Sequence, residues 1–260
     1  MIRTPITLAF AAVLALAACA PAGTRPAAAQ QIRTPEQLLQ AMHDRYAGKW
    51  YTTLTFMQKT TRHLPNDSVR VDTWREYGAM PGRLRIEMGD PALNNGAIYA
   101  NDSVYAIRGG QVAARRAQRN SLMVLGFDVY AQPVERSAEI LREEGFLPGT
   151  LRTDSWNGHP VYVVSSDNNG GHREFWIDAG TLLYVRSIEP VPGPAGAPAR
   201  VMDVRFEDYK PYAGGWVAER VDIRMDGKTM QMEEYSDVRV NQTLSPDLWI
   251  PEKWTTAPRP

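Results

Sequence analysis

The sequence predicts an α+β domain made mainly of one long antiparallel β-sheet, with about ten or eleven strands and two or three helices. Short segments of alternating apolar and polar residues recur from residue 53 to residue 240, as in strands that bury one face. Pairs of Gly, Pro, Asn and Asp separate these segments at hairpin spacing. The alternation is lost only between residues 118 and 146. A sheet of this length tends to curl, so we expect one curved face covered by the helices or by a ligand.

A helix is expected at the start of this domain. Thr34 suits the N-cap and Pro35 suits the first helical position, and apolar residues follow at helical spacing as far as Gly48. A second short helix is expected from Ser137 to Gly145. The expected strands carry apolar residues two apart, at Leu54 and Phe56, at Val69 and Val71, at Leu84, Ile86 and Met88, and at Met202, Val204 and Phe206.

Two-residue turns predict the register of several hairpins. Asn157-Gly158 is the strongest such signal in the middle of the chain. The segment Pro190–Ala199 is rich in Pro and Gly, so we expect a long exposed loop there and no strand. The predicted pairs are Tyr99 with Val104 around Asn101-Asp102, and Ile177 with Leu182 around Ala179-Gly180.

The turn at Asp226-Gly227 predicts the most complete hairpin. Around a two-residue loop, apolar residues face apolar residues and opposite charges face each other, whereas a slip of one residue would mismatch both faces. The predicted pairs are Met225 with Lys228, Ile223 with Met230 and Val221 with Met232 on one face, and Arg224 with Thr229, Asp222 with Gln231 and Arg220 with Glu233 on the other.

The first residues have the layout of a bacterial secretory signal. Arg3 precedes an apolar run that ends in small residues and is shorter than the about 20 residues of a membrane-spanning helix. The only cysteine, Cys19, follows Leu16-Ala17-Ala18, which resembles the lipobox of bacterial lipoproteins. We therefore expect a signal peptide at residues 1–18, a lipid anchor on Cys19 and a flexible Ala/Pro-rich tether over residues 19–34, ahead of a single domain from residue 35 to residue 260. An ordinary signal with an incidental cysteine is the alternative.

Composition narrows the functional classes. The 29 basic and 29 acidic residues cancel, which argues against a nucleic-acid partner. The single cysteine excludes an internal disulfide and zinc patterns built on paired cysteines. The four histidines are not at ligand spacing, and no hydrolase, metalloprotease or phosphate-loop motif occurs, so we expect no enzymatic activity, no metal and no cofactor. Zero net charge leaves membrane attachment to the Cys19 lipid, and Ala20 after it favours the outer membrane, facing the periplasm.

A series of short motifs follows the first helix, each weak alone but informative in order. They are Thr55-Phe56-Met57-Gln58-Lys59, a Pro-Gly turn before Arg83-Leu84-Arg85-Ile86-Glu87, Asn101-Asp102-Ser103-Val104-Tyr105, Trp176-Ile177-Asp178, Phe206-Glu207-Asp208-Tyr209, Gly214-Gly215 and Tyr235-Ser236-Asp237-Val238-Arg239-Val240-Asn241. In this order, over residues 35–251, they resemble the LolA/LolB-like family of outer-membrane lipoprotein-sorting proteins.

The resemblance implies an unclosed β-barrel with helices over a concave face that holds acyl chains of lipoproteins or lipids. A lipid-anchored member resembles the receiving branch of this family more than its soluble carriers. In the carriers an Arg before the first Pro turn latches the helices, but Met80 precedes Pro81 here, so that latch is not carried over. The expected lining residues are Leu54, Phe56, Leu84, Ile86, Met88, Val204, Phe206, Ile223, Met230 and Met232.

Two questions stay open at this point. Arg115, Arg116 and Arg119 form the only basic cluster, which is either a solvated loop or a contact for lipid phosphates or an acidic partner. The same fold could also serve as a periplasmic sensor that binds an envelope protein partner instead of a lipid. An open apolar concave face favours lipid binding, whereas a face filled by the protein's own side chains opposes it.

Overall fold

The computed structural model describes residues 31–168 and 171–260, and residues Ile32–Pro260 form one compact unit. The expected signal peptide, the Cys19 anchor and most of the expected tether lie outside the described residues. No helix within the described ranges is long and apolar enough to cross a membrane.

Strands make up most of this unit. The helices are α1 (Pro35–Tyr46), α2 (Ser121–Gly126) and α3 (Val134–Glu143), with 3-10 turns η1 (Pro91–Leu93), η2 (Asp128–Tyr130), η3 (Pro246–Trp249) and η4 (Pro251–Lys253). The strands are β1 (Thr53–His63), β2 (Val69–Ala79), β3 (Arg83–Met88), β4 (Gly96–Ala100), β5 (Ser103–Arg108), β6 (Gln111–Ala117), β7 (Thr150–Trp156), β8 (His159–Ser166), β9 (Arg173–Asp178), β10 (Tyr184–Val191), β11 (Arg200–Tyr212), β12 (Gly215–Met225) and β13 (Lys228–Val240).

The 13 strands of the described residues form one antiparallel sheet that does not close, in the order β6-β5-β4-β3-β2-β1-β13-β12-β11-β10-β9-β8-β7. This confirms the predicted fold class, with more strands than the ten or eleven expected. Two meanders lie side by side, and the first strand pairs with the last, β1 with β13. The edge strands β6 and β7 are consecutive in the sequence, so residues 118–149 must run from one edge of the sheet to the other. We call residues 118–149 the cover segment.

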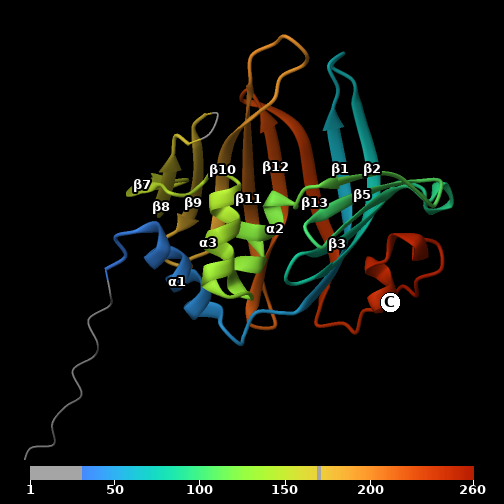
Figure 1. Ribbon diagram of the computed structural model, residues 1–260, viewed down its shortest axis with the longest axis horizontal. Coiled ribbons are helices and arrows are strands. Elements are labelled where there is room, and N and C mark those ends of the chain that lie inside the picture. Colours follow the sequence, from blue (N-terminus) through green and yellow to red (C-terminus); the bar gives the residue numbers. More distant parts are fainter. Residues whose placement is uncertain (1–30, 169–170) are drawn as a thin grey trace, which may run out of the picture. The chain divides into compact units, whose positions relative to one another are not determined.

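The helices gather over one face of the sheet, and Figure 1 shows α3 and α2 in front of the strands β10, β11 and β12, with α1 beside α3. Helix α1 begins as predicted, because the Thr34 hydroxyl accepts a hydrogen bond from the Gln37 N–H at 3.2 Å. Its apolar side directs Leu38 and Met42, both fully buried, into the core. Helix α3 starts three residues before the predicted Ser137, and α2 was not predicted at all.

The Asn-containing turns confirm their predicted registers. Tyr99 pairs with Val104 around Asn101-Asp102, and the turn at Asn157-Gly158 joins β7 to β8. Both asparagines adopt positive φ, 51° and 50°, which a two-residue turn of this type requires and which Asn tolerates well.

The turn at Ala179-Gly180 is wider than predicted, and the predicted pairing of Ile177 with Leu182 is wrong. Ile177 pairs instead with Tyr184. The Asp178 carboxylate accepts hydrogen bonds from the N–H groups of residues 180 and 181 at 3.0 and 2.7 Å. This side-chain capping stabilises a longer loop that a backbone-only turn rule does not describe.

The loop predicted over Pro190–Ala199 begins two residues later. Strand β10 continues to Val191, and Pro190 pairs with Val201 of β11. On its other side, β10 pairs with β9 only as far as Ile188. Pro190 therefore lies where one neighbouring strand has ended, so its missing N–H disrupts no interior ladder.

The hairpin at Asp226-Gly227 starts in the predicted register and then departs from it. Met225 pairs with Lys228 and Arg224 with Thr229, as predicted. A β-bulge follows and shifts the register by one residue, so the remaining predicted pairs are wrong. The observed pairs are Ile223 with Gln231, Asp222 with Met232, Val221 with Glu233 and Arg220 with Glu234.

The opposite face of β3–β5 is covered by the C-terminal segment. Trp254 is 1% exposed and packs against Ile98 and Ile107. The fully buried Arg85 places its guanidinium carbon 3.8 Å from the centroid of the Trp254 ring and donates to the Trp254 carbonyl at 2.6 Å. Its charge is paired with Glu87 at 2.7 Å. The C-terminal segment therefore stabilises the sheet from outside and leaves the inner face to the helices.

Candidate functional site

The inner face of the sheet and the helices enclose one continuous apolar core. Predicted lining residues from β1, β3, β11 and β12 lie in it together with residues of the cover segment. All of them are buried except Met88, which is half-buried at the margin. Their role in binding a ligand stays a prediction. The predicted lining residues that lie here are Leu54, Phe56, Leu84, Ile86, Met88, Val204, Phe206 and Ile223.

Met230 and Met232 do not belong to this face, so their predicted place in the lining is wrong. Because of the bulge in the β12–β13 hairpin, Gln231 and Glu233 pair with Ile223 and Val221 on the inner face. Met232, between them, pairs with Thr61 and Asp222 on the outer face. Met230 lies at the bulge, has no pairing partner in either neighbouring strand and is 38% exposed. One inserted residue thus replaces a predicted apolar pair with a polar one.

The protein's own side chains fill most of the concave face. Under α1, Trp50 lies 4.1 Å from Tyr130 between ring centroids. Under α2, Gly126 lies so close to Phe206 that a Cβ at Gly126 would be 2.8 Å from its ring. A cavity of about 80 Å³ remains between α2 and the strands β1–β3. Drug-sized ligands occupy pockets of roughly 300–1,000 Å³, so an acyl chain does not fit while α2 is seated.

The cover segment is held to the sheet by side chains. The backbone–backbone hydrogen bonds of residues 120–148 outside its helices are all internal to the segment. Asp102, at the β4–β5 turn, accepts from Arg119 at 2.7 Å and from Arg136 at 3.0 Å. The hydroxyl of Tyr130 accepts from the Tyr184 N–H at 2.9 Å. The segment can therefore move from the sheet without breaking a β-ladder.

A further link joins η2 to the Pro81-Gly82 turn. The Gly82 N–H donates to both carboxylate oxygens of Asp128 at 3.1 Å. Asp128 is only 3% exposed. Burial raises the pKa of this carboxyl to about 7, against the partial effect of the Gly82 hydrogen bond. A groove of about 440 Å³ runs beside the link. Although Met80 replaces the expected Arg, this turn is still connected to the cover segment through a polar contact.

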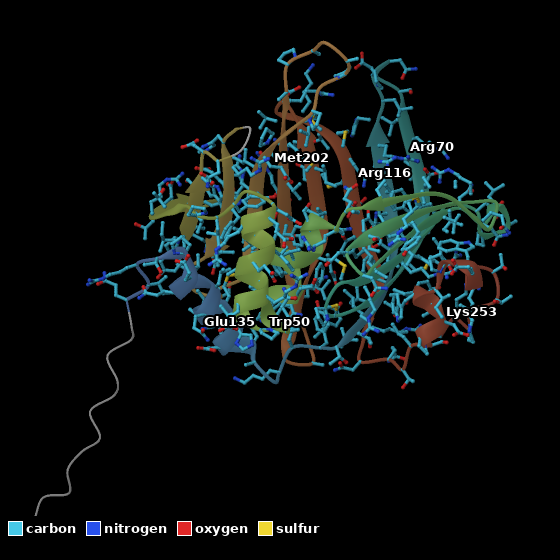
Figure 2. All side chains as sticks on the ribbon, viewed as in Figure 1. Trp50, Arg70, Arg116, Glu135, Met202 and Lys253 are labelled. Atoms are coloured by element: carbon cyan, nitrogen blue, oxygen red, sulfur yellow. The ribbon has the colours of Figure 1, made fainter. Side chains whose placement is uncertain are left out.

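The predicted basic cluster is not assembled. Arg115 and Arg116 are neighbours on β6, so their side chains point to opposite faces, with Arg116 (Figure 2) opposite Val104. Both are exposed. Arg119 is engaged in ion pairs with Asp102 at 2.7 Å and with Glu143 at 2.6 Å. An anionic contact by Arg115 and Arg116 stays a prediction, and Arg119 instead holds the cover segment.

Two buried glutamates, which the sequence did not single out, line the 80 Å³ cavity. Glu76 of β2 is 6% exposed and Glu233 of β13 is 7% exposed. Burial first, and the charge of Glu233 second, raise the pKa of Glu76 well above its usual range. Burial likewise raises the pKa of Glu233, although Tyr235 and Gln231 donate to its carboxylate at 2.8 and 2.6 Å. The one signal in the sequence was parity, because Glu76 alternates in step with the apolar Trp74.

A larger hollow of about 670 Å³ lies on the outer face, between β1–β3 and the C-terminal segment. Charged side chains of both signs border it, among them Arg75, Glu87 and Arg239. Arg259 also reaches into it and pairs with Glu87 at 2.9 Å. It is larger than the inner cavity, but charged side chains interrupt its apolar lining, so it suits an acyl chain less well than the inner face does.

Solved structures share this fold. A DUF1329-family protein from Desulfovibrio piger superposes with a TM-score of 0.55 at 12% identity, covering 82% of this chain and 95% of that one. At this identity the likeness shows a common fold and nothing further. A LolA-superfamily protein from Nitrosomonas europaea (TM-score 0.49, 12% identity, 79% and 94% covered) and an outer membrane lipoprotein-sorting protein domain from Vibrio parahaemolyticus (0.46, 13%, 84% and 97%) are also similar.

Similarity in sequence is short. No family model matches the chain. Maltoporin 2 of Yersinia pestis and of Yersinia pseudotuberculosis is 24% identical over 114 residues, which is 36% of this chain. The chain matches about a quarter of the maltoporin length, 27%, so this likeness does not define a family.

Proposed function

We propose that this protein is a lipid-anchored protein of the bacterial cell envelope that binds acyl chains of lipids or lipoproteins beneath the cover segment and helps to place them in the outer membrane. Cys19 would carry the anchor, with the compact unit in the periplasm. One observation carries the proposal: a continuous apolar concave face is covered by a segment that only side chains hold in place. Without the cover segment, this face is the large buried apolar surface that an acyl chain needs.

Binding requires the cover segment to move, because the closed cavity measures only about 80 Å³. An acyl chain contributes roughly 0.8 kcal/mol for each methylene that leaves water. It would take over the contacts that Leu122, Met123 and Phe127 make with the inner face. The cost is the displacement of a helix of six residues, so exchange of α2 for a long chain is energetically balanced and reversible. Such balance suits a protein that must also release its cargo.

Native mass spectrometry and uptake of a fluorescent C16 acyl probe test this proposal. The chain from Ala20 to Pro260 contains the whole compact unit and lacks the anchor, whose own acyl chains would confuse the count. Phe127→Ala removes a side chain from the cavity wall, so we expect several-fold tighter probe binding. Leu93→Ala is the control, because Leu93 is 58% exposed and does not line this cavity.

Two results would oppose the proposal. The first is purified protein that carries no lipid and takes up no probe, even with Phe127→Ala. The second is a protein complex that survives complete removal of lipid, which supports a sensor or interaction module instead. Equal probe binding by wild type and Leu93→Ala, together with a gain for Phe127→Ala, is the expected pattern.

A further inference from the structure

The buried pair Glu76 and Glu233 places two carboxyl groups in the cavity wall, which the binding of an acyl chain does not require. The two residues sit on the strands that flank β1, on the inner face, and both line the cavity. Their charges act on each other, and within the described residues no Arg, Lys or His forms an ion pair with either. A buried carboxylate without a cationic partner is costly, so this wall favours an added positive charge or an added proton.

The same wall presents unused hydrogen-bond acceptors. Glu76 makes no hydrogen bond among the residues described, although it is more than nine-tenths buried. Gln58 of β1 is fully buried between the two strands, and its Nε2 donates to the Thr60 hydroxyl at 2.8 Å. The Oε1 of Gln58 has no partner. Gln58 does not line the cavity itself, and Glu233 already accepts from Tyr235 and Gln231, so the unmet demand in this cavity is for a donor beside Glu76.

Aromatic rings complete the surroundings. Phe56 and Tyr235 stack with centroids 4.2 Å apart, and both line the cavity with Trp74. The faces of such rings attract cations. Beyond them the wall is apolar and includes Leu84 and Ile86. The volume of about 80 Å³ exceeds the roughly 10–15 Å³ that one water needs, so a group such as an aminomethyl fits without moving α2.

We propose that this cavity binds the protonated primary amino group of an amphiphile, held by Glu76 and Glu233, while its alkyl chain follows the apolar wall under α2. An ammonium has three N–H donors and no acceptor, which matches the two buried carboxyl groups of this wall. The inference rests on the proposed function and adds the head group that the site selects. A carboxylate or phosphate head is disfavoured there, because it would meet two like charges.

Competition against the fluorescent acyl probe at pH 7 tests the inference, with dodecylamine, dodecanol and dodecanoic acid as matched competitors. We expect dodecylamine to bind at least about tenfold more tightly than dodecanol, and dodecanoic acid to bind most weakly. Glu76→Gln keeps the shape of the protonated side chain and should reduce the preference for the amine to about twofold or less. Glu234→Gln is the control, since Glu234 is a strand neighbour on the outer face that pairs with Lys59 at 2.7 Å. It should leave the preference unchanged.

The outcomes separate the inference from the proposed function. If all three competitors bind equally, or if Glu76→Gln keeps the full preference, the inference is wrong while acyl-chain binding stands. If Glu234→Gln lowers the preference as much as Glu76→Gln does, the effect is general electrostatics and the inference is likewise wrong. If no competitor displaces the probe and no probe binds, both proposals fail.

Discussion

Asp128→Asn should stabilise the protein at alkaline pH, although it removes a carboxylate that accepts a hydrogen bond. Burial raises the pKa of Asp128 from 3.8 to about 7. The folded state therefore keeps this proton to a higher pH than the unfolded chain does, and stability falls as pH rises from about 4 through about 7. Asn keeps an oxygen for the Gly82 N–H at the same place and does not ionise.

The size of the effect follows from the shift. A difference of about three pKa units corresponds to about 4 kcal/mol at most, since one unit is 1.36 kcal/mol. We expect Asp128→Asn to be more stable than the wild type by up to about 4 kcal/mol at pH 8. At pH 4 the difference should be less than about 1 kcal/mol, because this pH is only just above the pKa of 3.8 at which Asp128 is half protonated in the unfolded chain. Urea unfolding followed by tryptophan fluorescence at pH 4, 6 and 8 measures this difference.

Asp102→Asn provides a control of opposite sign. The hydrogen bond from Arg119, and then the charges of Arg119 and Arg136, outweigh desolvation and lower the pKa of Asp102. Its ionised form therefore stabilises the fold at pH 8, and the variant should lose stability there. A gain for Asp128→Asn that is equal at pH 4 and pH 8 would refute the reasoning, because a neutral packing change has no such pH dependence.

Three core substitutions have clear expectations, all measured by urea unfolding at pH 7. Trp254→Ala removes the ring that covers Arg85 and should cost about 3–5 kcal/mol. Gly96→Ala places a Cβ 2.0 Å from the Ile86 carbonyl oxygen and 2.5 Å from the Trp254 ring and should also destabilise strongly, whereas equal stability would contradict this close packing of β3, β4 and the C-terminal segment. Gly126→Ala places a Cβ 2.8 Å from the Phe206 ring, so we expect a smaller loss of about 1–3 kcal/mol together with faster probe uptake, because α2 is lifted from the inner face.

The strand architecture could be predicted from the sequence because turn residues indicate hairpins and the alternation of apolar and polar residues indicates strands. Asn101-Asp102 and Asn157-Gly158 determine register through a backbone conformation that few residues adopt. The rule failed at Ala179-Gly180, where the carboxylate of Asp178 stabilises a wider turn. A turn predicted from two residues takes only their backbone preferences into account, so it leaves out the hydrogen bonds that a neighbouring side chain makes to the loop.

The candidate site was predicted less completely, for a related reason. A bulge after Asp226-Gly227 reverses the facing of residues 231–235 on β13, until a second irregularity opposite Thr55–Met57 restores it, and no residue in the sequence marks the first bulge. The methionines were therefore assigned to the inner face and Glu233 to the solvent. Glu76 was overlooked because charged residues on strands usually face solvent. Only the pairing of β1 with β13, which is not local in sequence, brings the two glutamates together.

Strand order also predicts how the whole unit responds to a ligand. Glu76 belongs to the first meander and Glu233 to the second, and Phe127 of the cover segment closes the same cavity. A bound amphiphile therefore contacts all three parts, and its binding energy is lost when any one of them unfolds. We expect dodecylamine at 100 times its dissociation constant to raise the free energy of unfolding by about 2.7 kcal/mol in a single transition. Hydrogen exchange would then show added protection in β2, β13 and α2 alike, and protection confined to one meander would contradict a site at the junction of β1 and β13.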